Sequence, residues 1–299
     1  MSAICNYIKP QTLAETLLLL SDNDDAHIIS GGTDLLLQIQ RERYQNCLLI
    51  DINGITELIG ISLTKSGLWI GAATKLSEIV SSEQLIGAFK VIGYAASLIG
   101  SPQIRNMASI GGNLCNASPS ADLSAPLLVL DTQAEITSAK EKRIVPLSEF
   151  FIGPSKTIIQ AGEMLTALHI PSPEHKAVAT YYKHSTRRAM DLAIVGVSAL
   201  LWRIEDKHYA RIGLSAVAPT PIRVYQAEQL ISGVKCIDDK LISEIAKLAS
   251  EACCPINDVR ASIEYRQTMV QALIKKALID VCTQLGLDWE LDKWQNQSF

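Results

Sequence analysis

Two pairs of adjacent glycines, each flanked by small polar residues, constrain the fold of this chain more than any other feature of its sequence. The first pair stands in SGGTD (residues 30–34), between the apolar segment AHIIS, which predicts a strand, and LLLQIQRER, which predicts a helix. The second stands in SIGGN (residues 109–113), between a predicted helix and chain that we expect to be extended. Both pairs therefore interrupt regular structure at points where the backbone is open to contact.

Paired glycines remove two Cβ atoms, so a ligand can touch the backbone and meet successive amide N–H groups. At a strand-to-helix junction these donors lie at the positive end of the helix dipole, which favours a phosphate. Two such turns could grip both phosphates of a dinucleotide, although a glycine pair is also an ordinary tight turn. The sequence contains neither GxGxxG nor GxxxxGKS/T, so it does not support a Rossmann site or a Walker loop.

Length and composition narrow the remaining possibilities. The 299 residues suffice for roughly two domains of about 150 residues each, and 48% of them are hydrophobic. The net charge of −4 lacks the basic balance typical of nucleic-acid binding, and no apolar run approaches the ~18 residues of a membrane span. The N-terminus shows no signal-peptide pattern. Seven scattered cysteines without CxxC, and five histidines without HxxxH, predict reduced thiols, no metal site and a cytoplasmic location.

The order of apolar patterns predicts three stretches. Residues 1–55 suggest a helix at TLAETLLLLSD, followed by a strand, the first glycine turn, a helix and a strand, as in a βαβ unit. Residues 56–171 contain the predicted strand GLWIGAAT, the predicted helix FKVIGYAASLIG and several short strands, and end near two prolines. From about Tyr181, DLAIVGVSALLWRI and HYARIGLSAVAP predict an antiparallel pair that turns at EDK, and two helices follow, the last ending at Gly286.

Nearly the whole chain resembles the FAD-binding medium subunits of the molybdenum hydroxylases, the family of xanthine dehydrogenase and carbon monoxide dehydrogenase flavoproteins. ISGGTDLL is similar to the family's first diphosphate motif, and QIRNMASIGGNLCNASPSADLSAPLLVLD is similar to its second. KHSTRRAMDLAIVGVSALL and PINDVRASIEYRQTMVQALIKKAL resemble the opening and the closing helices of its C-terminal domain.

This resemblance implies an α+β fold. A PCMH-type (VAO-like) FAD-binding domain would span residues 1–175, with subdomains of about 1–55 and 56–175. An α+β C-terminal domain with an antiparallel sheet and helices would span 176–286, and a tail would follow over 287–299.

The resemblance also implies a binding site for FAD, and it gives no residue a catalytic or metal-binding role. Backbone amides of both glycine segments would hold the diphosphate. Leu165 would pack against the flavin, or else be only a strand core residue, and Ile99 stands where some relatives have an aromatic ring. The residues implied to bind the cofactor are Ile28, Ile29, Ser30, Gly31, Gly32, Thr33, Asp34, Leu35, Ile99, Ser109, Ile110, Gly111, Gly112, Asn113, Asn116, Asp122, Leu165 and Lys183.

For Asp122, Lys183 and Asn116 the resemblance implies more specific environments. Asp122 would accept hydrogen bonds from a sugar or ribityl hydroxyl, or else cap the helix that follows. Lys183 would lie near the isoalloxazine, where a cation stabilises the anionic reduced flavin, or else belong to a solvated basic patch with Arg187 and Arg188. Asn116 stands where some relatives carry a hydroxyl residue.

By the same resemblance, the chain is the FAD-carrying electron-transfer subunit of a molybdenum hydroxylase complex. It would take electrons from the [2Fe-2S] clusters of an iron-sulfur small subunit and pass them to NAD or another acceptor, while a large subunit carries molybdopterin. The complex is expected to be a dimer of heterotrimers. A self-sufficient FAD-dependent reductase or oxidase on the same fold, and a non-catalytic flavin-binding docking subunit, are the alternatives.

Overall fold

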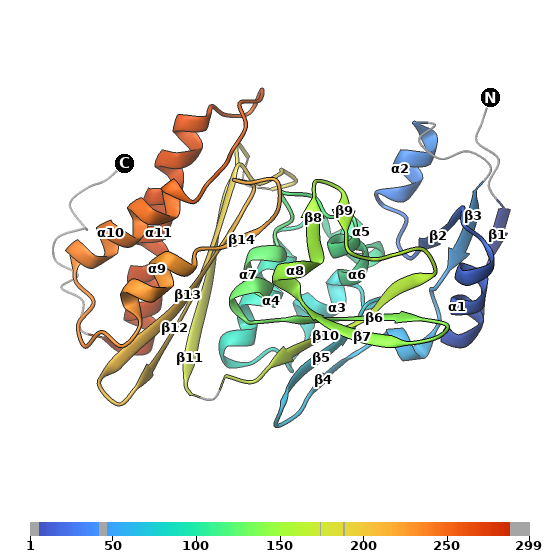
Figure 1. The fold of residues 1–299 in the computed structure, drawn as a ribbon, viewed down its shortest axis with the longest axis horizontal. Helices are drawn as coiled ribbons and strands as arrows, with labels where there is room; N and C mark the ends of the chain where they lie inside the picture. The colour runs from blue at the N-terminus through green and yellow to red at the C-terminus, as the bar shows by residue number, and fades with distance from the viewer. Residues whose placement is uncertain (1–5, 42–46, 174, 188, 288–299) are drawn as a thin grey trace.

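The computed structural model describes residues 6–41, 47–173, 175–187 and 189–287. The three larger sheets follow one another along the longest axis of the molecule, with the N-terminal sheet at the right of the view and the C-terminal sheet towards the left (Figure 1). Helices cover these sheets, and three clusters of buried apolar side chains form the core. The α+β architecture expected from the sequence is confirmed.

The N-terminal sheet is parallel and has the strand order β1-β3-β2. Its elements are β1 (Asn6–Ile8), α1 (Leu13–Asp22), β2 (Ala26–Ile29), α2 (Leu35–Gln40) and β3 (Leu48–Asp51). The predicted βαβ unit is confirmed as β2, α2 and β3, and α1 begins where expected, because the Thr12 side chain accepts a hydrogen bond from the Glu15 amide. The short strand β1 was not predicted.

The central sheet is antiparallel, with the order β4-β5-β10-β6-β7. Its strands are β4 (Ile61–Leu63), β5 (Gly67–Gly71), β6 (Gln133–Ser138), β7 (Lys142–Pro146) and β10 (Glu163–Pro171). Around it lie η1 (Thr56–Leu58), α3 (Leu76–Ser81), η2 (Gly87–Phe89), α4 (Lys90–Ser97), α5 (Pro102–Met107), α6 (Ile110–Cys115), α7 (Ser124–Val129), α8 (Leu147–Phe150) and the hairpin of β8 (Phe151–Gly153) and β9 (Lys156–Thr157). The strand expected at GLWIGAAT is therefore present as β5, and the several short strands expected after it are present as β6, β7 and β10.

The C-terminal sheet is also antiparallel, and one face of it packs against the last helix while the other faces α4 and α7. Its elements are β11 (Ala177–His184), β12 (Val195–Ile204), β13 (Lys207–Ser215), β14 (Ile222–Arg223), α9 (Tyr225–Ile231), α10 (Asp239–Glu251) and α11 (Ile263–Leu285). The predicted pair with its turn at EDK is confirmed as β12 and β13. The last helix ends at Gly286, whose φ of 81° is left-handed, whereas α9 was not predicted.

One cysteine differs from its expected state. Cys47 is disulfide-bonded, so the expectation of reduced thiols is wrong for this residue; its spacing in the sequence gives no sign of a disulfide framework. Among the described residues, no helix combines the length and apolar character needed to cross a membrane. The boundaries near residues 55, 175 and 286 stay predictions, and the tail lies outside the described residues apart from its first residue.

Candidate functional site

Two adjoining cavities lie between the N-terminal sheet and the central part of the molecule. Their volumes are about 650 Å³ and about 280 Å³. Cavities of this scale are typical of small-molecule sites. Seven residues border both cavities, so the two are neighbouring parts of one cleft: His27, Ile28, Ser30, Ser109, Gly112, Cys115 and Ser155.

The SGGTD turn forms one wall of the smaller cavity. Gly32 has a φ of +66°, a conformation that costs glycine little and other residues more. The amides of Gly31, Gly32, Thr33 and Asp34 donate no hydrogen bond within the described parts of the chain. Successive free amides of this kind form a binding site for an anion such as a phosphate. The turn itself was predicted correctly as a strand-to-helix junction.

The SIGGN segment differs from its prediction. It was expected to precede extended chain, but Ile110 begins the helix α6, and the Ser109 hydroxyl caps this helix by accepting from the Gly112 amide at 3.2 Å. Glycine is unfavourable inside a helix, yet here it has a packing reason. A Cβ on Gly111 would lie 2.6 Å from the carbonyl oxygen of Ala72.

Four of the five amides of the second segment, those of residues 110–113, are already hydrogen-bonded within the protein. Those of Ile110 and Gly111 donate to the carbonyls of Thr74 and Ala72, at 3.0 and 2.8 Å. The amide of Asn113 donates to Ser109 O at 3.0 Å. The expectation that both segments present free amides therefore holds for the first segment alone. The second segment presents side chains instead.

The first segment packs against the chain that immediately precedes the second segment. A Cβ on Gly31 would lie only 2.1 Å from the carbonyl oxygen of Met107 and 2.8 Å from the amide nitrogen of Ala108, so only glycine permits this approach. Lys75 bridges the same two points, because its ammonium group donates to Ser30 Oγ at 3.3 Å and to Met107 O at 3.0 Å. Lys75 was not predicted from the sequence, since a single lysine after a strand carries no motif.

The donors and acceptors of this cleft suit FAD. The free amides of the first turn can donate to phosphate oxygens. Asn113 Oδ1 is buried, has no hydrogen-bond partner among the described residues and belongs to a side chain that borders the smaller cavity, so it can accept from a ligand hydroxyl or N–H group. Ile28, Ile52 and Leu165 give the larger cavity apolar walls that suit a planar ring.

Most of the residues predicted to bind the cofactor border this cleft. Those that border the smaller cavity are Ile28, Ile29, Ser30, Gly31, Gly32, Thr33, Asp34, Leu35, Ile99, Ser109, Gly112, Asn113 and Asn116. Gly111 and Leu165 border only the larger cavity. Ile110, Asp122 and Lys183 border neither: Ile110 is fully buried in the core, and the other two bind each other.

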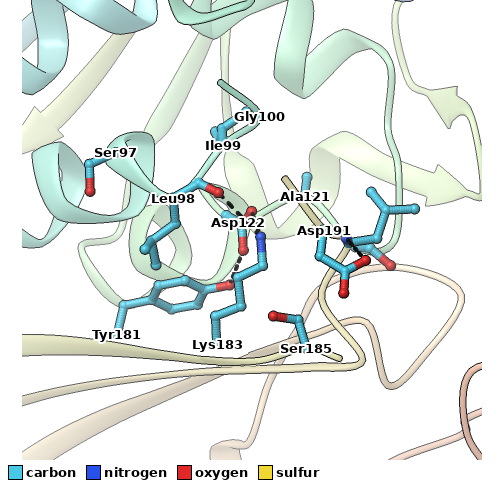
Figure 2. A network of polar contacts seen from close by, with 12 residues as sticks. Ser97, Leu98, Ile99, Gly100, Ala121, Asp122, Tyr181, Lys183, Ser185 and Asp191 are labelled. Carbon is cyan, nitrogen blue, oxygen red and sulfur yellow. Dashed lines mark hydrogen bonds and ion pairs between the residues drawn. The ribbon is translucent and has the colours of Figure 1, made fainter. Parts of the chain in front are cut away.

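Asp122 and Lys183 form a buried ion pair between the central part and β11 (Figure 2). Lys183 Nζ lies 2.7 Å from Asp122 Oδ2, and Tyr181 Oη donates to Asp122 Oδ1 at 2.8 Å. Lys183 also donates to the carbonyl of Leu98 at 3.3 Å. Burial raises the pKa of the Asp122 carboxyl above its usual value, while Lys183 and Tyr181 act in the opposite direction.

The structure rules out one alternative role that the sequence left open for each of these two residues. Asp122 does not cap the following helix, because α7 has Leu123 at its N-cap and no side-chain cap bond there. Lys183 does not belong to a solvated patch, since its side chain is only 9% exposed. Arg187 is exposed, whereas Arg188 lies outside the described residues.

Nearly the full length of the chain is similar to known proteins. The sequence model for the FAD binding domain in molybdopterin dehydrogenase matches residues 3–173, and that for the CO dehydrogenase flavoprotein C-terminal domain matches residues 180–281. The xanthine dehydrogenase FAD-binding subunit of Escherichia coli is 33% identical over 292 residues, which are 96% of this chain and 99% of that protein.

Carbon monoxide dehydrogenases give similar matches. The medium chain from Afipia carboxidovorans is 30% identical over 275 residues, covering 91% of this chain and 95% of that one. A solved chain of carbon monoxide dehydrogenase from Hydrogenophaga pseudoflava superposes with a TM-score of 0.90 at 28% identity, covering 95% of this chain and 99% of the other. This chain therefore belongs to the family of FAD-binding medium subunits of the molybdenum hydroxylases.

Proposed function

We propose that this chain carries FAD and passes electrons from the [2Fe-2S] clusters of a small subunit to NAD or another acceptor. The observation that supports this most is the set of four amides at Gly31 to Asp34, which have no acceptor among the described residues and belong to residues that border the cleft. Relatives along nearly the full length are FAD-binding or medium subunits of xanthine and carbon monoxide dehydrogenases. FAD, when bound, would supply the one- and two-electron redox chemistry.

The residues of the cleft would bind and orient the cofactor. The amides of residues 31–34 would hold the diphosphate. Ser109 and Asn113 would contribute a hydroxyl donor and an amide acceptor from the second segment. Ile99 and Leu165 would pack against the cofactor at the two cavities and exclude water from it.

We assign the Asp122–Lys183 pair an anchoring role beside this cleft. Because the carboxylate of Asp122 balances the ammonium of Lys183 at 2.7 Å, the charge of Lys183 is not free to act on a reduced flavin. The pair instead fixes β11 against the loop that follows α6. The sugar-binding role expected for Asp122 is correspondingly not part of the proposal, since both of its oxygens already accept hydrogen bonds.

The partners follow from the same proposal. We propose that the chain assembles with an iron-sulfur small subunit and a molybdopterin large subunit as a dimer of heterotrimers. The FAD-binding domain would comprise residues 1–175, in two subdomains, and the C-terminal domain residues 176–286. The cytoplasmic location stays a prediction.

The decisive experiment is to purify the chain from its native source and record its visible spectrum together with an inventory of the companion subunits. We expect flavin absorption, iron-sulfur absorption and molybdenum in the purified complex. A colourless chain that does not bind added FAD would overturn the proposal. Reduction of a small substrate by the isolated chain with NADH would identify a self-sufficient reductase, and a bound but unreactive flavin would identify a docking subunit.

A further inference from the structure

Lys75 lies behind the wall that the two glycine segments form. It directly precedes α3, and its neighbours pair with the second segment: the amide of Leu76 donates to Ala108 O at 2.9 Å, and the amide of Ile110 donates to Thr74 O at 3.0 Å. The backbone around Lys75 is thus fixed against the second segment. Its side chain reaches across to the first.

Within the described residues, the ammonium group of Lys75 has three hydrogen-bond acceptors, and all of them are neutral. They are Ser30 Oγ at 3.3 Å, Asn53 Oδ1 at 2.7 Å and Met107 O at 3.0 Å. Asn53 continues the network, because its side-chain amide donates to the carbonyl of Ser30 at 2.7 Å. Lys75 therefore holds the entry to the first turn both directly and through Asn53, and it holds the end of α5 at the same time.

The positive charge of Lys75 lies close to the turn that would bind an anion. Burial lowers the pKa of the Lys75 ammonium, while the negative charges of Asp51 and Glu78 act in the opposite direction. A half-buried cation whose direct partners are neutral keeps much of its field for a ligand nearby. Ser30, one of those partners, immediately precedes the free amides of residues 31–34.

We propose that Lys75 is a positioning residue for the diphosphate of FAD: it fixes the distance between the two glycine segments and supplies positive charge behind them. This inference rests on the proposed function, since it requires a diphosphate in the cleft. It predicts that the contribution of Lys75 is specific to ligands that carry phosphates. A merely structural lysine would affect every ligand of the cleft alike.

The test uses the full chain, stripped of flavin and titrated with FAD, ADP and riboflavin. Lys75→Gln should weaken the binding of FAD and of ADP by about 10- to 100-fold, the range expected for hydrogen bonds to a charged group. Riboflavin, which lacks phosphates, should bind within twofold of wild type. Lys75→Arg should recover most of the loss, and Lys90→Gln, at an exposed position, serves as the matched control.

Two results would overturn the inference. One is FAD binding by Lys75→Gln within twofold of wild type, and the other is an equal loss for riboflavin. Failure of the wild-type chain to bind FAD would instead overturn the proposed function.

Discussion

Replacing Lys183 with methionine tests whether the buried ion pair anchors the two parts of the molecule. The side chains of Lys183 and Asp122 are only 9% and 7% exposed, and their charged atoms lie 2.7 Å apart. Lys183→Met keeps most of the aliphatic stem and removes the ammonium group. Asp122 is then left buried, with Tyr181 as its remaining hydrogen-bond partner.

The expected cost is about 3–5 kcal/mol of unfolding free energy at pH 7.5, because removing one partner leaves an uncompensated buried charge. The pKa of the Asp122 carboxyl, already raised by burial, should rise further without Lys183. A group whose folded pKa lies above its unfolded value contributes stability that is present below the unfolded pKa and lost as pH rises through the folded pKa. The deficit of the variant should therefore shrink towards pH 5.

Urea unfolding followed by circular dichroism at pH 7.5 and pH 5 measures both effects. Lys142→Met is the matched control, because the Lys142 side chain is 57% exposed and its ammonium lies 3.2 Å from Glu135. Because the Lys142 ammonium group is largely solvated, this pair should contribute about 1 kcal/mol or less. The anchoring role would be refuted if Lys183→Met cost no more than this control, or if its deficit grew as the pH fell.

Two further predictions concern the glycine contact and the acid stability. Gly31→Ala places a Cβ 2.1 Å from Met107 O, so it should push the segments apart and weaken FAD binding at least about tenfold in a fluorescence titration. The control is Gly153→Ala, whose Cβ would meet nothing closer than 4.0 Å and which should bind FAD like wild type. Equal affinities of wild type and both variants for FAD would contradict the reasoning. The buried Arg266 and two backbone amides hold the pKa of Asp258 at about 2, so this carboxylate contributes stability above its unfolded pKa that is lost as pH falls towards 2. Asp258→Asn should therefore flatten the acid side of the stability profile between pH 5 and pH 2, and an unchanged slope would show that the ion pair contributes nothing.

Local patterns predicted much of the fold, because in several elements the spacing of apolar residues indicates the type of structure and the flanking residues mark its ends. Three signals follow one another here: the apolar run of β2 indicates a strand, the glycines a turn and the leucines of α2 a helix. The βαβ unit could therefore be predicted. The long alternation of β12 and β13 around a charged turn was equally clear. By contrast, β1 has only three residues, all exposed, and it exists because it pairs with β3.

The contacts of the site were less predictable, because they join residues that are distant in the chain. Lys75 reaches Ser30 and Met107 only after the folded chain has brought three segments together. The pairing of Lys183 with Asp122 also crosses between two parts of the molecule. The resemblance placed both residues near the cofactor, but neither the motif nor its spacing could show that they neutralise each other.

The two glycine pairs share one sequence signal and serve different physical purposes. Gly31 and Gly111 are each packed against the backbone of another segment, where a Cβ would lie 2.1 or 2.6 Å from a carbonyl oxygen. Both are thus needed for contacts within the protein, not for access by a ligand. Gly32 provides the left-handed conformation that turns the chain, and the amides of this first turn donate no hydrogen bond among the described residues. The amides of Gly111 and Gly112 already donate within the protein, so anion binding by the main chain should depend mainly on residues 31–34.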